Sequence, residues 1–156
     1  MNEQKLIVLL ENQLSSFLQI MFPAAMESLN RSDVAAPGKW SAREQLAHIA
    51  CYHELFLARL SRMLNEPDPA LPQYRAEDDP LWPQWRAMPA ETLLPKTEEL
   101  RHQLIQTVHA LTPEQWERTG RHSKFGSLTV AEWLEFFLVH EGHHLYAMFP
   151  LLRTGM

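Results

Sequence analysis

The chain has 156 residues, of which 46% are hydrophobic and 21% charged, as in an ordinary globular protein with one core. Its net charge of -5 argues against a nucleic-acid partner, because phosphates require a basic surface. A lone cysteine excludes an internal disulfide, and no apolar run has the length of a membrane span or signal peptide. We therefore predict one domain over residues 1–156, in a cytoplasmic protein without a membrane partner.

Helical periodicity dominates the first part of the chain, and strand-like alternation is absent. A first helix is expected from about Glu3 to Phe22, before Pro23, and a turn over residues 35–39. A second helix opens with a capping box at Ser41 to Glu44, in which serine and glutamate satisfy each other's backbone amides, and continues to about Leu64. The predicted inner face of this helix comprises His48, Ile49, Tyr52, Phe56, Leu60 and Met63.

Residues 65–89 contain six prolines and show no clear period. A connection of this length inside a compact domain is usually functional or covers a site. Trp82 and Trp85, in an expected turn of helix, are candidates to wall a substrate pocket, and Asp78 and Asp79 are candidates for its mouth.

The second half of the chain predicts two more long helices. The third begins at residue 91 or 95 and ends near 111. Capping boxes at 112–115 and 129–132 open a short helix and a last long one over 130–152, with a glycine-bracketed loop over 120–126 between them. Four long amphipathic helices in one small domain predict an all-α fold, a four-helix bundle.

The last helix contains the string His140-Glu141-Gly142-His143-His144, a literal H-E-x-x-H. On its face this string denotes a zinc metalloprotease with Glu141 as general base. Such enzymes need a third ligand downstream, and the extended pattern would place it at Pro150. No aspartate, glutamate or histidine follows His144, so the sequence does not predict an H-E-x-x-H metalloprotease.

The histidines themselves still predict a metal site. His140 and His144 lie one helical turn apart on an otherwise apolar stripe, where two separate imidazoles would each need a buried partner. His48 lies on the inner face of the second helix, and facing helices of a bundle bring such residues together. Three neutral imidazoles leave a divalent ion an open coordination position, as in catalytic sites. We predict His48, His140 and His144 as the ligands of one ion.

Other polar residues have alternative interpretations. Glu141 is either a base beside the metal or a solvent-facing glutamate, and His143 is expected to pack or support the ligands. Cys51 is expected to be a buried inert thiol. The remaining histidines are interpreted as surface or boundary residues, namely His53, His102, His109 and His122.

Two segments carry a family resemblance. Residues 40–49, Trp40-Ser41-Ala42-Arg43-Glu44-Gln45-Leu46-Ala47-His48-Ile49, resemble the W-S-x-x-E-x-L-x-H-L segment of the DinB-like (YfiT-like) metalloprotein superfamily, the DNA-damage-inducible family. Residues 126–144 resemble its closing helix. The resemblance implies a four-helix bundle of the DinB/YfiT type, commonly dimeric, with zinc or nickel on His48, His140 and His144. We therefore expect a homodimer.

The resemblance also implies a choice of chemistries. Some relatives use the metal to turn a low-molecular-weight thiol into a thiolate for transfer or isomerisation, and others are described as hydrolases. Many members carry Arg-Gly-Gln after the paired histidines, where this chain has Leu145-Tyr146-Ala147. We predict a metal-dependent enzyme that activates a water or a thiol against a small molecule. The alternatives are a metal-binding bundle without turnover, serving in stress response, and a bundle whose histidines bind nothing.

Overall fold

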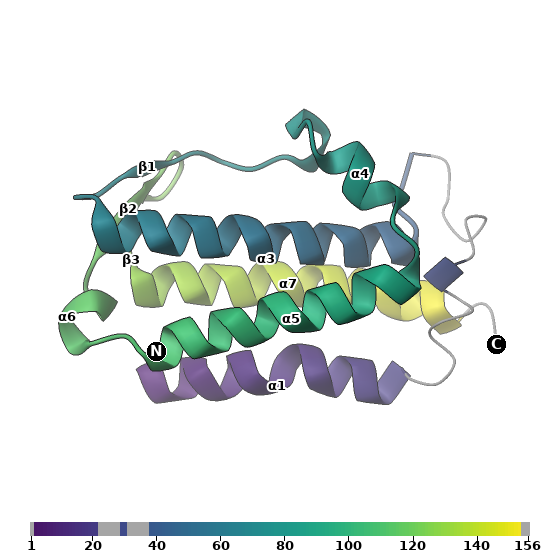
Figure 1. Cartoon of the computed structure of the whole chain (residues 1–156), viewed down its shortest axis with the longest axis horizontal. Helices are drawn as coiled ribbons and strands as arrows, with labels where there is room; N and C mark the ends of the chain where they lie inside the picture. Colours follow the sequence, from purple (N-terminus) through teal and green to yellow (C-terminus); the bar gives the residue numbers. More distant parts are fainter. Residues whose placement is uncertain (1, 22–28, 31–37, 154–156) are drawn as a thin grey trace.

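Four long helices form the body of the protein in a computed structural model, which describes residues 2–21, 29–30 and 38–153 (Figure 1). α3 packs against α5 and α7, and α1 packs against α7 and α5. This arrangement confirms the predicted all-α bundle. Residue 22 of the first predicted helix and residues 35–37 of the predicted turn lie outside the described residues. The four helices are α1 (Glu3–Met21), α3 (Ala42–Asn65), α5 (Ala90–His109) and α7 (Val130–Arg153).

The three helix starts predicted from capping boxes are confirmed, whereas α5 begins at Ala90 without a side-chain cap, just before the predicted residue 91 or 95. Ser41 Oγ accepts a hydrogen bond from the Glu44 amide, and the Glu44 carboxylate accepts one from the Ser41 amide. The same reciprocal pair forms in the box at 112–115, which opens the short helix α6 (Pro113–Trp116), and in the box at 129–132 before α7. These caps satisfy amides that the first turn leaves unpaired, and so set where each helix begins.

The apolar core consists of two clusters along the bundle axis. One contains Leu46, Ile49 and Leu145, and the other contains Phe56 and Phe137 with their neighbours. On α7 the change from one cluster to the other falls between Leu138 and Leu145, where His140 and His144 lie, and on α3 it falls between Cys51 and Tyr52, one turn after His48. The polar site therefore lies about midway along α7 and in the first third of α3, with packed side chains on either side that fix its backbone.

A small sheet at one end of the bundle was not predicted. β1 (Ala70–Leu71) runs parallel to β2 (Thr119–His122), and β2 pairs antiparallel with β3 (Gly126–Thr129), so the predicted loop over 120–126 is the turn of a hairpin. A Cβ at Gly120 would lie 2.5 Å from Leu71 Cδ1 and 2.8 Å from Met63 Cγ, so any other residue here would force these buried side chains to move. The Gly120 carbonyl also accepts a hydrogen bond from Trp133 Nε1 at 2.9 Å, which fixes the hairpin to α7.

The proline-rich connection runs along the outer side of α3 from the sheet to the other end of the bundle (Figure 1). It contains β1, the short 3-10 helix η1 (Ala76–Asp78) and α4 (Trp82–Ala87). Two arginines of α3 hold it by its backbone, Arg59 at the Pro72 carbonyl and Arg62 at the Ala70 carbonyl. Within the described ranges, no helix is both long and apolar enough to cross a lipid bilayer.

Candidate metal centre

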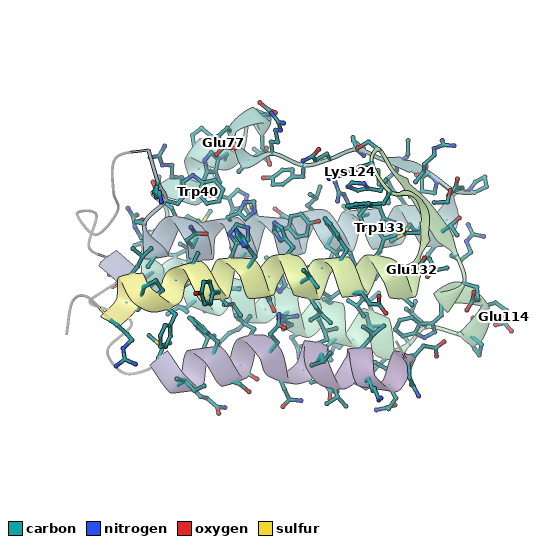
Figure 2. All side chains as sticks on the ribbon, turned by 180° about the vertical axis from the view of Figure 1, so that it is seen from behind. Trp40, Glu77, Glu114, Lys124, Glu132 and Trp133 are labelled. Carbon is teal, nitrogen blue, oxygen red and sulfur yellow. The ribbon has the colours of Figure 1, made fainter. Side chains whose placement is uncertain are left out.

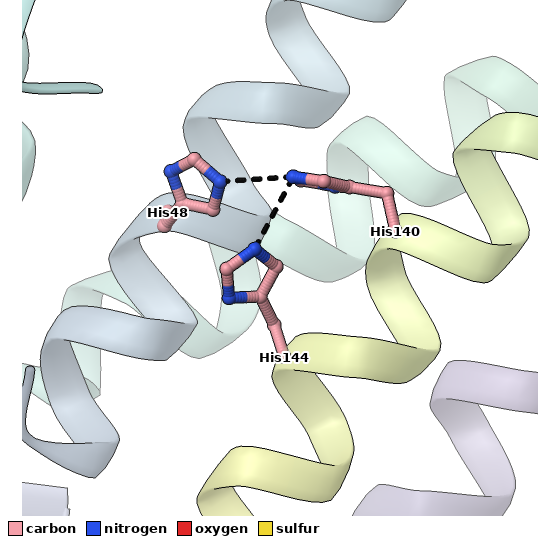
Figure 3. Close-up of side chains that lie close together, drawn as sticks. All are labelled: His48, His140 and His144. Atoms are coloured by element: carbon pink, nitrogen blue, oxygen red, sulfur yellow. Dashed lines mark hydrogen bonds between the residues drawn. The ribbon is translucent and has the colours of Figure 1, made fainter. Parts of the chain in front are cut away.

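The three predicted ligands meet between α3 and α7 (Figure 3). His140 Nε2 lies 3.1 Å from His48 Nε2 and 3.2 Å from His144 Nε2, and the three ligand atoms all lie within 4.8 Å of one another. An ion at 2.0–2.1 Å from tetrahedral imidazole nitrogens separates those nitrogens by about 3.3–3.4 Å. The two separations that involve His140 are therefore close to those that one small divalent ion requires.

A neighbouring side chain sets the tautomer of one ligand. Gln45 Oε1 lies 2.6 Å from His144 Nδ1, and a carbonyl oxygen can only accept, so Nδ1 carries the proton. The Nε2 lone pair of His144 is then directed at the cluster, as a metal ligand requires. The ring of His48 is held by packing, since its buried Nδ1 has no hydrogen-bond partner among the described side chains.

Aromatic rings enclose the cluster. The Tyr52 ring centroid lies 4.0 Å from that of His140, and the Trp40 centroid lies 4.9 Å from that of His48. Tyr74 and Trp82, both from the proline-rich connection, lie at 5.9 and 6.1 Å from the His48 ring. This connection therefore covers part of the site, as its length predicts, and the rings shield the imidazoles from water.

Burial keeps the three imidazoles neutral. Loss of solvent, with lesser repulsion from neighbouring histidines, lowers the pKa of His48 to about 3, of His140 to about 2 and of His144 to about 4. At neutral pH all three are unprotonated, which is the form that binds a metal.

These lowered pKa values predict acid sensitivity of the metal-free fold. An unfolded histidine binds a proton near pH 6.5, whereas His48, His53, His140 and His144 resist protonation until about pH 4 or below. Stability should therefore be full above pH 6.5 and fall as pH decreases toward 4, by up to about 2 kcal/mol per histidine between pH 6.5 and 5. Urea unfolding in the presence of a chelator, at pH 7.5 and 5.5, measures this loss of stability. An unchanged midpoint would contradict the buried neutral state, and His48→Gln should weaken the dependence.

Glu141 does not face the cluster. Its carboxylate forms an ion pair with Arg101 of α5, accepts a hydrogen bond from Gln13 Nε2 of α1 at 2.8 Å, and lies 3.5 Å from His53 Nε2. The side chain is buried, so the alternative of a solvent-facing glutamate is wrong. These contacts give Glu141 a place in the packing of α7 against α1 and α5, with His53 of α3 at its edge.

The other histidines divide into two groups. His102 and His109 are exposed, as expected, and His143 is exposed with its ring 5.1 Å from that of His144. The expectation that His53 and His122 are surface or boundary residues is wrong, because both are buried. His53 Nδ1 donates to the Ile49 carbonyl, and His122 Nδ1 accepts from two amides of the hairpin turn. In both residues, Nδ1 is therefore used to hold the backbone of the fold.

The remaining candidates lie at the edge of the site. Burial raises the pKa of the Cys51 thiol to about 12, so this cysteine is inert, as expected. Asp79 accepts a hydrogen bond from the Tyr74 hydroxyl at 2.9 Å and so fixes a ring that covers His48. Trp82 lies beside His48, whereas Trp85 contacts Lys96.

Sequence reasoning missed Gln45 and Arg59. Gln45 precedes His48 by one turn but contacts a histidine of another helix, which no spacing along the chain indicates. The sequence did contain a signal for Arg59, because this residue follows His48 by three helical turns and lies among buried residues of α3.

A four-helix bundle with a buried three-histidine cluster defines a class of metal-site protein, and comparison with known proteins places the chain within it. The sequence model of the DinB superfamily matches residues 10–148, so the chain belongs to this superfamily. The structure of YfiT from Bacillus subtilis, described as a probable metal-dependent hydrolase with an unusual four-helix bundle topology, has a TM-score of 0.77 at 21% identity and covers 97% of this chain and 86% of that one. This likeness shows the fold.

Two sequence relatives come from Oceanobacillus iheyensis and are named as candidate metal-dependent hydrolases. One is 27% identical over 108 residues, which are 69% of this chain and 62% of that protein. The other is 27% identical over 123 residues, which are 77% of this chain and 70% of that protein. The chain thus spans somewhat less than two thirds of the first relative's length.

Proposed function

We propose that this protein is a metal-dependent hydrolase of a small-molecule substrate, with one zinc or nickel ion held by His48, His140 and His144. The convergence of three Nε2 atoms, at separations that suit one tetrahedral ion, carries this proposal. The names of the sequence relatives support the same class of reaction. When bound, such an ion lowers the pKa of a water molecule and polarises a substrate carbonyl.

The chain's own residues prepare the site for this reaction. Burial keeps the three imidazoles unprotonated, and Gln45 directs the His144 lone pair toward the ion. The rings of Tyr52 and Trp40 pack at a tilt against the ligands and exclude bulk water, which strengthens electrostatic interactions inside the site. Three protein ligands leave a coordination position for water or substrate.

A panel of activated esters and amides tests the proposed function. Zinc- or nickel-loaded protein should consume one water per bond cleaved and release acid and alcohol or amine, and chelation should abolish turnover. A second panel, a low-molecular-weight thiol with electrophilic acceptors, tests thiol transfer. Thiol conjugation without any hydrolysis by the loaded protein would overturn the hydrolase proposal, and loaded protein without either activity would favour a metal-binding bundle without turnover.

A further inference from the structure

A cavity of about 220 Å³ adjoins the histidine cluster. Tyr52 and Arg59 of α3, Tyr74 of the proline-rich connection and Phe136 of α7 line it, and His140 forms part of its wall. The β2–β3 hairpin closes the cavity through Lys124 and its neighbours. Figure 2 shows Lys124 on this hairpin, on the same side of the bundle as Trp40. A molecule in the cavity would therefore contact one of the three proposed ligands directly.

Arg59 is a buried cation without an anionic partner. The residue is only 5% exposed, and its guanidinium donates to the Pro72 carbonyl at 2.5 Å and to the Tyr52 hydroxyl at 3.4 Å. It also faces the rings of Tyr52 and Trp133 at 5.9 and 5.3 Å. In the described part of the chain, no carboxylate bonds to it. Arg101, the other buried arginine, has Glu141 as its counter-ion.

The residues that line the cavity add to this excess of positive charge. It includes Arg59 and Lys124 but, over the described ranges, no aspartate or glutamate, in a chain whose net charge is -5. Leaving a guanidinium out of water without a counter-ion is energetically costly. A ligand with one negative charge would offset that cost, and the planar fork of arginine matches a carboxylate with two parallel hydrogen bonds.

We propose that Arg59 binds the carboxylate of a small anionic substrate, whose reactive group lies toward His140. The substrate class is a monocarboxylate with a flat or apolar body, which the rings of Tyr52, Tyr74 and Phe136 contact. One buried cation matches one negative charge, so a phosphate monoester dianion fits less well. This inference names the substrate of the proposed hydrolase and rests on that function for its reactive end, but the carboxylate contact itself requires no metal.

Calorimetric titration of the full chain with benzoate and with benzamide tests the contact. Wild-type protein, metal-loaded and metal-free, should bind benzoate and not benzamide, and Arg59→Gln should weaken benzoate binding about 10- to 100-fold. Arg59→Lys keeps the positive charge but loses the planar guanidinium, so its affinity for benzoate should lie between those of wild type and Arg59→Gln. The matched control is Arg62→Gln, one turn away, which also loses a bond to the connection and should bind as wild type.

Several outcomes would overturn the proposal. The proposal fails if wild-type protein binds neither compound at millimolar concentrations or binds both equally, and neither result depends on the folding of a variant. Equal benzoate binding by wild type and Arg59→Gln would place the anion elsewhere. Binding that disappears on metal removal but survives Arg59→Gln would place it on the ion. Tighter binding of phenyl phosphate than of benzoate would contradict the single-charge argument.

A hydrolysis assay is the second test of the proposal. With 4-acetoxybenzoate and its neutral methyl ester, loaded wild type should prefer the free acid, and Arg59→Gln should lose that preference by a higher KM. If neither ester is cleaved but benzoate still binds through Arg59, the hydrolase proposal fails and the anion site stands. If both are cleaved with equal efficiency, the anion site fails and the hydrolase stands.

Discussion

Replacing Glu141 with leucine is expected to destabilise the fold by about 3–5 kcal/mol, because it leaves the Arg101 guanidinium charged and unpaired in the interior. Two of its nitrogens, Nε and Nη1, already lack a partner among the described residues, so the Glu141 carboxylate is its main compensation. Urea unfolding of the metal-free protein measures the loss. Combining Glu141→Leu with Arg101→Met should recover most of it, since a buried pair can often be replaced by apolar residues of similar volume.

The exposed Arg62–Glu66 pair of α3 is a matched control. Glu66→Ala should change stability little, because an exposed pair is screened by water and salt. The competing interpretation of Glu141, as the general base of an H-E-x-x-H enzyme, predicts the opposite pattern for Glu141→Leu. That variant would then unfold at the wild-type urea concentration, load metal normally and lose hydrolysis.

Replacing His140 with alanine is expected to remove the metal. His140 Nε2 is the atom that contacts both other ligands, so its loss leaves two nitrogens on different helices without the third that joins them. The affinity should fall by more than the 10- to 100-fold that follows loss of a ligand's hydrogen-bond partner. Elemental analysis after purification without chelators should find about one ion per wild-type chain and close to none in the variant.

His143→Ala is the control for this experiment, since it removes an exposed imidazole from the same turn of α7. It should retain the metal and any hydrolytic activity. Full occupancy in His140→Ala, or loss of metal in His143→Ala with a retained helical spectrum, would show that the ligand set is different.

The sequence predicted the helices and the histidine cluster because both depend on local rules. Capping boxes fix where α3 and α7 begin, and the helical period then places His48 on one inner face and His140 and His144 on the other. Packing these two inner faces together brings the three histidines to one place. Periodicity therefore indicated the site's central residues, although it did not show that His53 is also buried.

What the sequence could not predict depends on contacts between elements. α7 packs on α1 as well as on α3, so Glu141, about 100° around the helix from His140, is buried on a second face. The contact of Gln45 with His144 depends on how α3 and α7 are rotated against each other. The strands were not predicted because they have two to four residues, too few for an alternating pattern.

The central claim is that one divalent ion is bound by three imidazoles, and anomalous diffraction from crystals of metal-loaded protein tests it most directly. Data on both sides of the zinc or nickel absorption edge should give one peak per chain, about 2.0–2.1 Å from the Nε2 atoms of His48, His140 and His144. A loaded protein with its peak elsewhere, or with no peak between α3 and α7, would contradict the account.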